Sequence, residues 1–456
     1  MTVIGATTNG GTTNGGTPSA KKAAHQKYTI GRAILEPAVH HESFEKLWET
    51  KWKGPCTMGV YPFMFGTVKD FEPVAQAIIE VRPIKLQHKN TLLTIVKQKG
   101  LKEPYDWDEY AEMFFPKAEE LSEIAARAEE AGEKEKASEY YLRSSALYRI
   151  ARFPAPRSEK QRLAWTLGKE AFYKGGALME HPIREVEISH THRNGSEGHT
   201  IPVNFLLPPG ASPQRPAPVV MIFTGLDGYR TELAVWQRGW LEKGVATVVV
   251  EIPGTGDSPA AKDDPTSPDR QWSSVLDWIA GQAELDKERV VVWGFSTGGY
   301  YALRVAHTHA DRLLGSISLG GGAHYMFDCD WLAHVNKLEY PFDLADTLAY
   351  KFGYADLESF VQEAHKFSLV NDGTLDRPCC KNVLVVNGEN DEIFPVEDLH
   401  VALRHGSPKS ARVVEGRKHM GEPESFFVIL RWIHDLLGLD GDVAAQMRLL
   451  PSKTKY

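Results

Sequence analysis

Cysteine is scarce in this chain of 456 residues. There are four cysteines, Cys56, Cys329, Cys379 and Cys380, which are too few for a disulfide scaffold. They form no CxxC pair, which argues against a zinc site. We expect the adjacent Cys379 and Cys380 to be small buried side chains at the entrance of a strand.

The sequence also lacks long hydrophobic runs and dense clusters of positive charge. No stretch of 18 apolar residues occurs, so no helix is expected to span a membrane. Lys and Arg number 52 and Asp and Glu number 60, and this net charge of −8 without a basic stripe argues against nucleic-acid binding. Neither a GxGxxG fingerprint nor a P-loop is present, so we expect no nucleotide cofactor, and nothing indicates a metal.

Recognisable targeting signals are missing as well. The N-terminus has no apolar core behind a positively charged start, and the C-terminal SKTKY is not a peroxisomal tripeptide. We therefore expect a soluble, cytoplasmic protein. Apolar residues make up 42% of the chain, which is enough for a globular core.

The N-terminal part of the chain divides into two segments of different character. Residues 1–26 contain two copies of TTNGG and few large apolar side chains, so we expect a disordered tail. Residues 27–180 are predicted to form a helical cap domain, because apolar residues recur at helical spacing over 117–130, 137–151 and 159–179. An aromatic-rich stretch at 48–71 should be mostly core, with a few rings facing a ligand.

Residues 181–440 have the pattern of a catalytic α/β domain. Eight β-branched runs alternate with helical segments and begin near residues 183, 201, 218, 244, 289, 313, 381 and 410. The alternation predicts a mostly parallel eight-stranded sheet, and an Asn-Gly pair between the first two runs predicts an antiparallel start. Residues 320–380 should be a helical insert that forms a lid or pocket wall, and residues 441–456 a C-terminal tail.

The motif GFSTG, at 294–298, lies between an apolar strand and a helix. A Ser on such a sharp turn requires a strained backbone, and the glycines two residues away on either side let strand and helix approach. We therefore predict that Ser296 is a nucleophile. The alternative is a spectator Ser in a Gly-rich turn. Ser258, in another Gly-rich turn, is not expected to act.

An acid and a histidine should follow this nucleophile in the chain. Asp391 comes directly after a later strand, with Glu392 as its competitor and Asp398 as a weaker candidate in the next helix. His419 follows the last strand, whereas His405 precedes it. In this prediction His419 is the general base and acid, and Asp391 fixes the tautomer of its ring.

The loop after the third predicted strand offers the second donor of an oxyanion hole. Gly225 in this loop allows close approach of the backbone, so the N–H of Leu226 is predicted to act together with the N–H of Thr297 as the two donors. Asp227, Tyr229 and Arg230 follow in the same loop as candidate substrate contacts. The alternative for Asp227 and Arg230 is a structural ion pair that holds the loop.

Several longer motifs extend beyond these single residues. They are TGLDGYR, EIPGTGDSPA, SPDRQWSSVLDW, VVWGFSTGGYYALRVAHTHADRLLG, HGSPK and PSKTK, with FEKLWETKWK, VYPF, DFEPV and YRIARFP nearer the N-terminus. Together they resemble the fungal yellowish-green-type polyketide-shortening hydrolases of the melanin pathway. The resemblance begins near residue 40 and departs in the N-terminal tail and in an added segment at 82–104. More distantly, the chain resembles bacterial FrsA-like hydrolases and a C–C hydrolase of nicotine breakdown.

The resemblance implies an α/β-hydrolase fold with an N-terminal helical cap and no metal or organic cofactor. Enzymes of this family shorten a heptaketide naphthopyrone to tetrahydroxynaphthalene and release acetoacetate, and the product feeds dihydroxynaphthalene melanin, a pigment. The family's triad falls on Ser296, Asp391 and His419 of this chain. The resemblance also implies a polyketide substrate, homodimers formed through the N-terminal helices, and association of some members with intracellular vesicles.

Two other functions fit the same features. An esterase, lactonase or thioesterase acting on another fungal polyketide would use the same triad and oxyanion hole, because these groups suit any acyl transfer. A regulatory protein with an idle hydrolase core would not need the complete Ser-Asp-His order.

Overall fold

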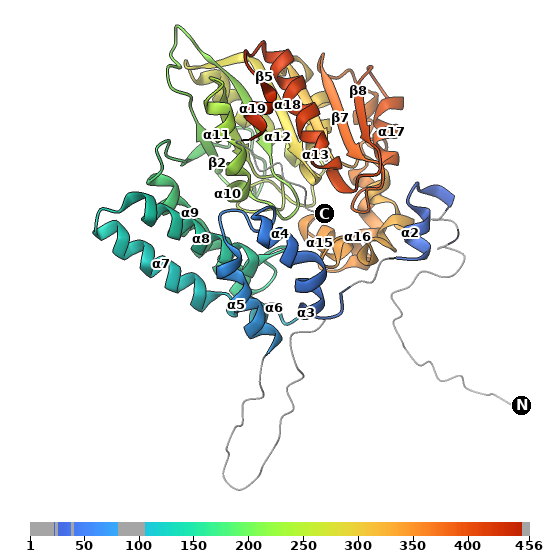
Figure 1. Cartoon of the computed structure of the whole chain (residues 1–456). Helices are drawn as coiled ribbons and strands as arrows, with labels where there is room; N and C mark the ends of the chain where they lie inside the picture. Colours follow the sequence, from blue (N-terminus) through green and yellow to red (C-terminus); the bar gives the residue numbers. More distant parts are fainter. Residues whose placement is uncertain (1–21, 23–25, 38–40, 81–104, 449–456) are drawn as a thin grey trace, which may run out of the picture.

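The computed structural model describes residues 22, 26–37, 41–80 and 105–448. A central sheet is covered by helices on both faces, and a separate group of helices, α3 to α9, lies beyond one end of its strands (Figure 1). The predicted tail at 1–26 lies almost entirely outside the described residues, and so does the added segment at 82–104. No helix of the described part is both long and apolar enough to cross a bilayer.

The sheet has eight strands in the order β1-β2-β4-β3-β5-β6-β7-β8. Their bounds are β1 (Arg184–Ser189), β2 (Thr200–Leu206), β3 (Ala217–Phe223), β4 (Ala246–Val250), β5 (Leu285–Phe295), β6 (Gly315–Leu319), β7 (Val383–Gly388) and β8 (Ser410–Val414). β2 pairs antiparallel with both β1 and β4, and every other pairing is parallel. The predicted sheet, including its antiparallel start, is confirmed.

The middle strands are apolar throughout because both of their faces are buried. Along β3, Val219, Met221 and Phe223 point into the larger hydrophobic cluster of the protein, whereas Val220 and Ile222 point into a second cluster on the other face. The carboxyl ends of the parallel strands therefore meet at one edge, which is where sites form in open α/β sheets.

The N-terminal region is helical. Its elements are α2 (Gly31–Leu35), α3 (Phe44–Leu47), η1 (Trp48–Trp52), α4 (Lys53–Met58), α5 (Val68–Ile79), α6 (Trp107–Glu112), α7 (Phe115–Glu130), α8 (Lys134–Arg152) and α9 (Glu159–Ala177). The three predicted runs correspond to α7, α8 and α9. Gly132, with φ of +76°, follows α7, and the hydroxyl of Ser158 caps the start of α9, so local sequence sets these boundaries.

The α/β part contains the remaining helices. They are α10 (Arg230–Leu233), η2 (Ala234–Trp236), α11 (Arg238–Leu241), α12 (Ser267–Gly281), α13 (Thr297–Thr308), η3 (Ala310–Arg312), η4 (Tyr325–Phe327), α14 (Cys329–Leu332), η5 (Val335–Lys337), α15 (Leu344–Lys351), α16 (Leu357–Glu363), η6 (Ala364–Phe367), η7 (Thr374–Asp376), α17 (Glu397–Arg404), η8 (His419–Gly421), α18 (Glu424–Leu437) and α19 (Val443–Met447). The elements from η4 to η7 make up the insert predicted at 320–380.

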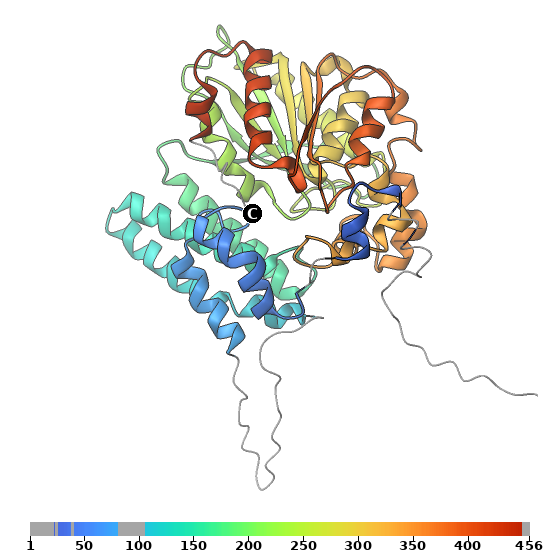
Figure 2. The same ribbon diagram turned by 45° about the vertical axis from the view of Figure 1, so that its right-hand side comes forward.

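The insert lies beyond the same end of the strands as the N-terminal helices (Figure 2). Trp52 of η1 packs edge-on against Phe342 of the insert, with ring centroids 5.7 Å apart. One hydrophobic cluster thus continues from the N-terminal helices through the insert to the sheet.

Residues 441–448 differ from the tail predicted at 441–456, and the rest of that tail lies outside the described residues. In α19, Gln446 is completely buried, and its side-chain amide donates to the carbonyl of Gly239 at 3.1 Å. This short helix packs on the α/β part, which therefore extends past residue 440.

Candidate active site

Ser296 occupies the turn between β5 and α13 in a strained conformation, with φ of +54° and ψ of −121°. A Cβ added to Gly294 would lie 2.1 Å from the carbonyl oxygen of Gly298, and one added to Gly298 would lie 2.3 Å from that of Thr224. Both glycines are therefore required for strand and helix to meet this closely.

Ser296, His419 and Asp391 form a continuous chain of hydrogen bonds. The Oγ of Ser296 lies 2.8 Å from Nε2 of His419, and Nδ1 of His419 lies 2.8 Å from Oδ2 of Asp391. Because a carboxylate only accepts, Nδ1 carries the donated proton, and Nε2 of the neutral ring is left to accept from the hydroxyl of Ser296. This is the arrangement that activates a serine nucleophile.

The carboxylate of Asp391 is fully buried and fixed by several donors. Its Oδ1 accepts the backbone N–H groups of Ile393 at 2.7 Å and Phe394 at 3.1 Å, and Oδ2 also accepts from the side chain of Asn387 at 2.7 Å. Asn387 in turn accepts the N–H of Met420, so the same network holds the loop that carries His419.

The other candidates for the acid and for the histidine make contacts outside this chain of hydrogen bonds. Glu392 forms an ion pair with Lys418 at 2.8 Å. Asp398 accepts the backbone N–H groups at the start of η4, and burial raises its pKa to about 6. His405 pairs with Asp376 on the surface.

Two backbone N–H groups beside Ser296 are available to a ligand. Thr297 is the first residue of α13, where N–H groups have no partner within the helix. The loop that carries Leu226 passes close to Ser296, since a Cβ on Gly225 would lie 3.6 Å from that of Ser296. Within the described residues, neither Leu226 N–H nor Thr297 N–H donates to a protein acceptor.

A mostly apolar pocket opens over Ser296 and His419. Aromatic residues of the N-terminal region line the pocket, together with residues of the insert and of the loop after β3. The lining residues include Trp52, Tyr61, Phe153, Leu226, Asp227, Glu339 and Tyr340.

Asp227 anchors the polar side of this pocket. Its carboxylate accepts the hydroxyl of Tyr61, from the N-terminal region, and that of Tyr340, from the insert, the latter at 2.8 Å. Burial, followed by the charge of Asp227, raises the pKa of both phenols well above the usual range, so both remain neutral donors.

The prediction that Tyr229 and Arg230 contact substrate is wrong. Both side chains are only 1% exposed and neither lines the pocket. The alternative ion pair of Arg230 with Asp227 does not form either. Arg230 instead pairs with three other carboxylates, those of Glu185, Glu251 and Asp257.

Glu339 is a pocket residue that the sequence did not reveal. Its Oε1 accepts the backbone N–H of His419 at 3.3 Å, and Lys418 lies 3.5 Å from its Oε2. Burial and the nearby charge of Asp391 raise the pKa of Glu339 to about 7. No motif surrounds Glu339, and only its place in the insert hinted at a pocket position.

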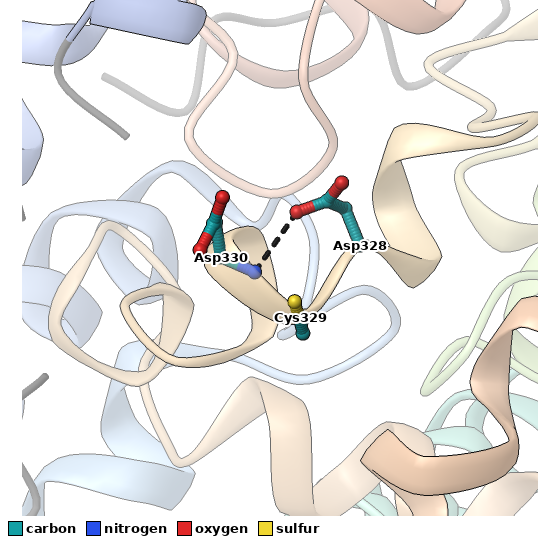
Figure 3. Close-up of side chains that lie close together, drawn as sticks. All are labelled: Asp328, Cys329 and Asp330. Carbon is teal, nitrogen blue, oxygen red and sulfur yellow. Dashed lines mark hydrogen bonds between the residues drawn. The ribbon is translucent and has the colours of Figure 1, made fainter. Parts of the chain in front are cut away.

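One compact group of possible metal ligands lies outside the pocket (Figure 3). Ligand atoms of Asp328, Cys329 and Asp330 lie within 4.8 Å of one another. However, Lys27 contacts Asp328 at 2.5 Å, and Asp328 accepts the N–H of Asp330 to cap α14. These contacts give the group a structural role.

Comparisons with known proteins agree with this architecture. The family model described as "Esterase FrsA-like" matches residues 70–435. Esterase FrsA of Yersinia pestis (strain Pestoides F) is 26% identical over 334 residues, which span 71% of this chain and 74% of the relative.

Solved structures share the fold. The 2,6-dihydroxy-pseudo-oxynicotine hydrolase superposes with a TM-score of 0.61 at 20% identity, covering 85% of this chain and 95% of that one. Wild-type AbyA5 gives 0.57 at 22% identity, covering 74% and 89%. At these identities the likeness concerns the arrangement of the elements.

Proposed function

Because this chain belongs to the FrsA-like esterase family of α/β-hydrolases, we propose that it is a serine hydrolase with Ser296 as its nucleophile. The observation that carries the proposal is the hydrogen-bonded chain from Ser296 through His419 to Asp391. Two backbone N–H groups beside Ser296, which donate to no acceptor in the described part of the chain, add the second requirement of acyl transfer.

In the first half of the reaction, Ser296 attacks a carbonyl carbon while Nε2 of His419 takes the hydroxyl proton. Asp391 stabilises the imidazolium that forms. The N–H groups of Leu226 and Thr297 donate to the developing oxyanion. Collapse of the tetrahedral adduct breaks the bond to the leaving group, which takes the proton from His419.

In the second half, water replaces the leaving group. His419 accepts a proton from the water as it attacks the acyl-serine, and returns a proton to Ser296 as the acid departs. The sum of both halves consumes one water for each bond cleaved, with no net redox change.

The N-terminal helices act as a cap in this proposal. Trp52, Tyr61 and Phe153 belong to that region and line the pocket above Ser296. A wall of rings excludes bulk water and shapes the site for a flat substrate. We therefore assign the chemistry to the α/β part and substrate choice mainly to the cap and the insert.

We further propose that the substrate is a heptaketide naphthopyrone, which is cleaved at a C–C bond to tetrahydroxynaphthalene and acetoacetate for dihydroxynaphthalene melanin. Ser296 would attack a side-chain ketone of the ring-opened form, and the polyphenol ring would leave with the electron pair and be protonated by His419. The sequence motifs support this substrate. The acceptor oxygens of Asp227 and Glu339 in an aromatic pocket suit a ligand rich in phenolic hydroxyls.

Ester hydrolysis of another polyketide is the second candidate. The esterase name of the bacterial relatives, Esterase FrsA, favours it, and the same groups would perform it. An ester differs only in its leaving group, an alcohol that His419 protonates on oxygen.

A labelling experiment tests the nucleophile. A fluorophosphonate probe should label the wild-type protein and a Ser258→Ala control, because Ser258 bonds to Gln271 away from the pocket. It should not label Ser296→Ala. Equal labelling of all three proteins would refute the proposal.

Product analysis tests the substrate. The purified protein is incubated with the naphthopyrone, and tetrahydroxynaphthalene and acetoacetate are sought by mass spectrometry. Hydrolysis of simple esters without either product would support the second candidate instead.

A further inference from the structure

The loop that carries Leu226 is held in place by contacts with a helix that lies outside the α/β part. Inside the loop, the N–H of Gly225 donates to the carbonyl of Gly228 at 3.1 Å and closes a tight turn. The residues that follow contact the C-terminal end of α8, a helix of the N-terminal region. The position of one oxyanion donor therefore depends on a helix that contributes no reacting group.

Arg152, the last residue of α8, makes the main contacts. Its side chain is completely buried. One guanidinium nitrogen, Nη1, donates to the carbonyl oxygen of Asp227 at 2.8 Å, and the other, Nη2, donates to Glu232 at 2.9 Å. The guanidinium carbon lies 3.6 Å from the centre of the Tyr229 ring. A single planar group thus contacts the loop after Leu226 at two points, Asp227 and Tyr229, and the following helix α10 at a third, Glu232.

Glu232 completes the connection. The same oxygen that binds Arg152 accepts the backbone N–H of Tyr229, and the other oxygen lies 3.3 Å from Nε of Arg149. Burial alone would raise the pKa of Glu232, but Arg152 and Arg149 outweigh burial and lower it, so the carboxylate stays charged. Two cations from α8 and one anion from α10 therefore join helix and loop.

We propose that Arg152 is a positioning residue, through which the N-terminal region orients the backbone N–H of Leu226 toward the oxyanion. This inference rests on the proposed serine-hydrolase function. A displaced donor weakens binding of the oxyanion more than binding of the neutral substrate, because charge develops only during the reaction. Loss of Arg152 should therefore lower kcat and leave KM nearly unchanged.

The test compares Arg152→Met with Arg143→Met. Arg143 lies on the same helix and also forms an ion pair, partly buried, with Asp70 at 2.6 Å, but it does not contact the loop. With p-nitrophenyl acetate, we expect kcat of Arg152→Met to fall about 10- to 100-fold with KM within about twofold. Arg143→Met should keep kcat within about twofold of the wild type at a similar loss of Tm.

A second readout uses benzeneboronic acid, which forms a tetrahedral adduct with an active serine. Its inhibition constant should rise about as much as kcat falls for Arg152→Met, and should stay unchanged for Arg143→Met. Equal kcat and equal boronate affinity in the two variants, measured below both Tm values, would overturn the inference.

The conservative variant Arg152→Lys keeps the inference testable if Arg152→Met does not fold. Lysine keeps a positive charge near Glu232 but lacks the planar fork that also reaches the carbonyl of Asp227. We expect folding to recover while kcat stays at least about fivefold low; full recovery of kcat would contradict the proposed role. If Ser296→Ala keeps the activity of the wild type, the proposed function itself fails. Equal kcat values for the Arg152 and Arg143 variants would contradict only the positioning role of Arg152.

Discussion

Glu339 accepts a hydrogen bond from the backbone N–H of His419, although the two residues are 80 positions apart in the chain. The contact places a buried carboxyl with a pKa of about 7 next to the proposed general base. As pH rises through 7, Glu339 acquires a negative charge, which favours the imidazolium form of His419.

Glu339→Gln should therefore change the pH profile of activity. Without the charge that Glu339 acquires, the imidazolium form of His419 is less favoured, so the acid limb of the kcat/KM profile should move to lower pH, by up to about one pH unit. Rates with p-nitrophenyl acetate between pH 5 and 9 would measure the movement. An identical acid limb in the variant and the wild type would mean that Glu339 does not influence His419.

Asp391→Asn should lower kcat by about 10³- to 10⁴-fold, because the amide no longer favours the tautomer that leaves Nε2 free to accept. Glu392→Gln is the matched control, since Glu392 pairs with Lys418 rather than His419. It should stay within about threefold of the wild type. The reverse order of effects would assign the acid role to Glu392.

Tyr61→Phe and Tyr340→Phe should each weaken binding of a phenolic substrate by about 1–2 kcal/mol, because Asp227 loses one of the two hydroxyl donors that hold its carboxylate in position at the pocket wall. KM for p-nitrophenyl acetate, which has no phenolic hydroxyl, should change less. Parallel KM measurements with the naphthopyrone would show whether the loss is selective.

Gly298→Ala should destabilise the fold by at least about 3 kcal/mol, because the added Cβ would meet two backbone carbonyls that cannot move independently. Gly281→Ala is the control. No atom lies within 4 Å of its added Cβ, and alanine is the better helix former, so it should be neutral or slightly stabilising. Urea unfolding of both variants would compare them.

Lys351→Met should stabilise the protein by about 1 kcal/mol at pH 7. The amine is buried, contacts only the hydroxyl of Tyr301 and aromatic rings, and has no acidic partner among the described residues. Burial, followed by repulsion from Lys262, lowers the pKa of Lys351 well below its usual value.

The sign of the pH effect at Lys351 follows from proton binding. Between the folded and unfolded pKa values the unfolded chain binds the extra proton, so wild-type stability rises with pH in that window and is lost as pH falls through the folded pKa. Lys351→Met should flatten that dependence, whereas a surface control, Lys381→Met, should not change it. A steeper dependence in Lys351→Met would contradict this account.

Periodicity was enough to predict the sheet and the long helices, because their residues are selected by burial on one or two faces. Chain order was enough to select Ser296, Asp391 and His419, which the structure brings together. The environment of Arg230 was not predictable, because its partners Glu185, on β1, and Glu251, directly after β4, are brought close to it only when the sheet folds.

The pocket walls were hidden from the sequence for a similar reason. Tyr61 and Tyr340 are far apart in the chain, and nothing in the sequence links either of them to Asp227, yet both donate to its carboxylate. The short helix α19 was missed because five residues give too few turns for a periodic pattern.

The walls that select a substrate and the groups proposed to react with it lie in different stretches of the chain. Residues 51–64 and 340–341 border the pocket without contributing to the strand ends that hold Ser296 and Asp391. Grafting those two stretches from a relative would exchange the preference of the enzyme while its machinery stays in place. Evolution could retune such a protein in the same way, by insertions and replacements at the rim.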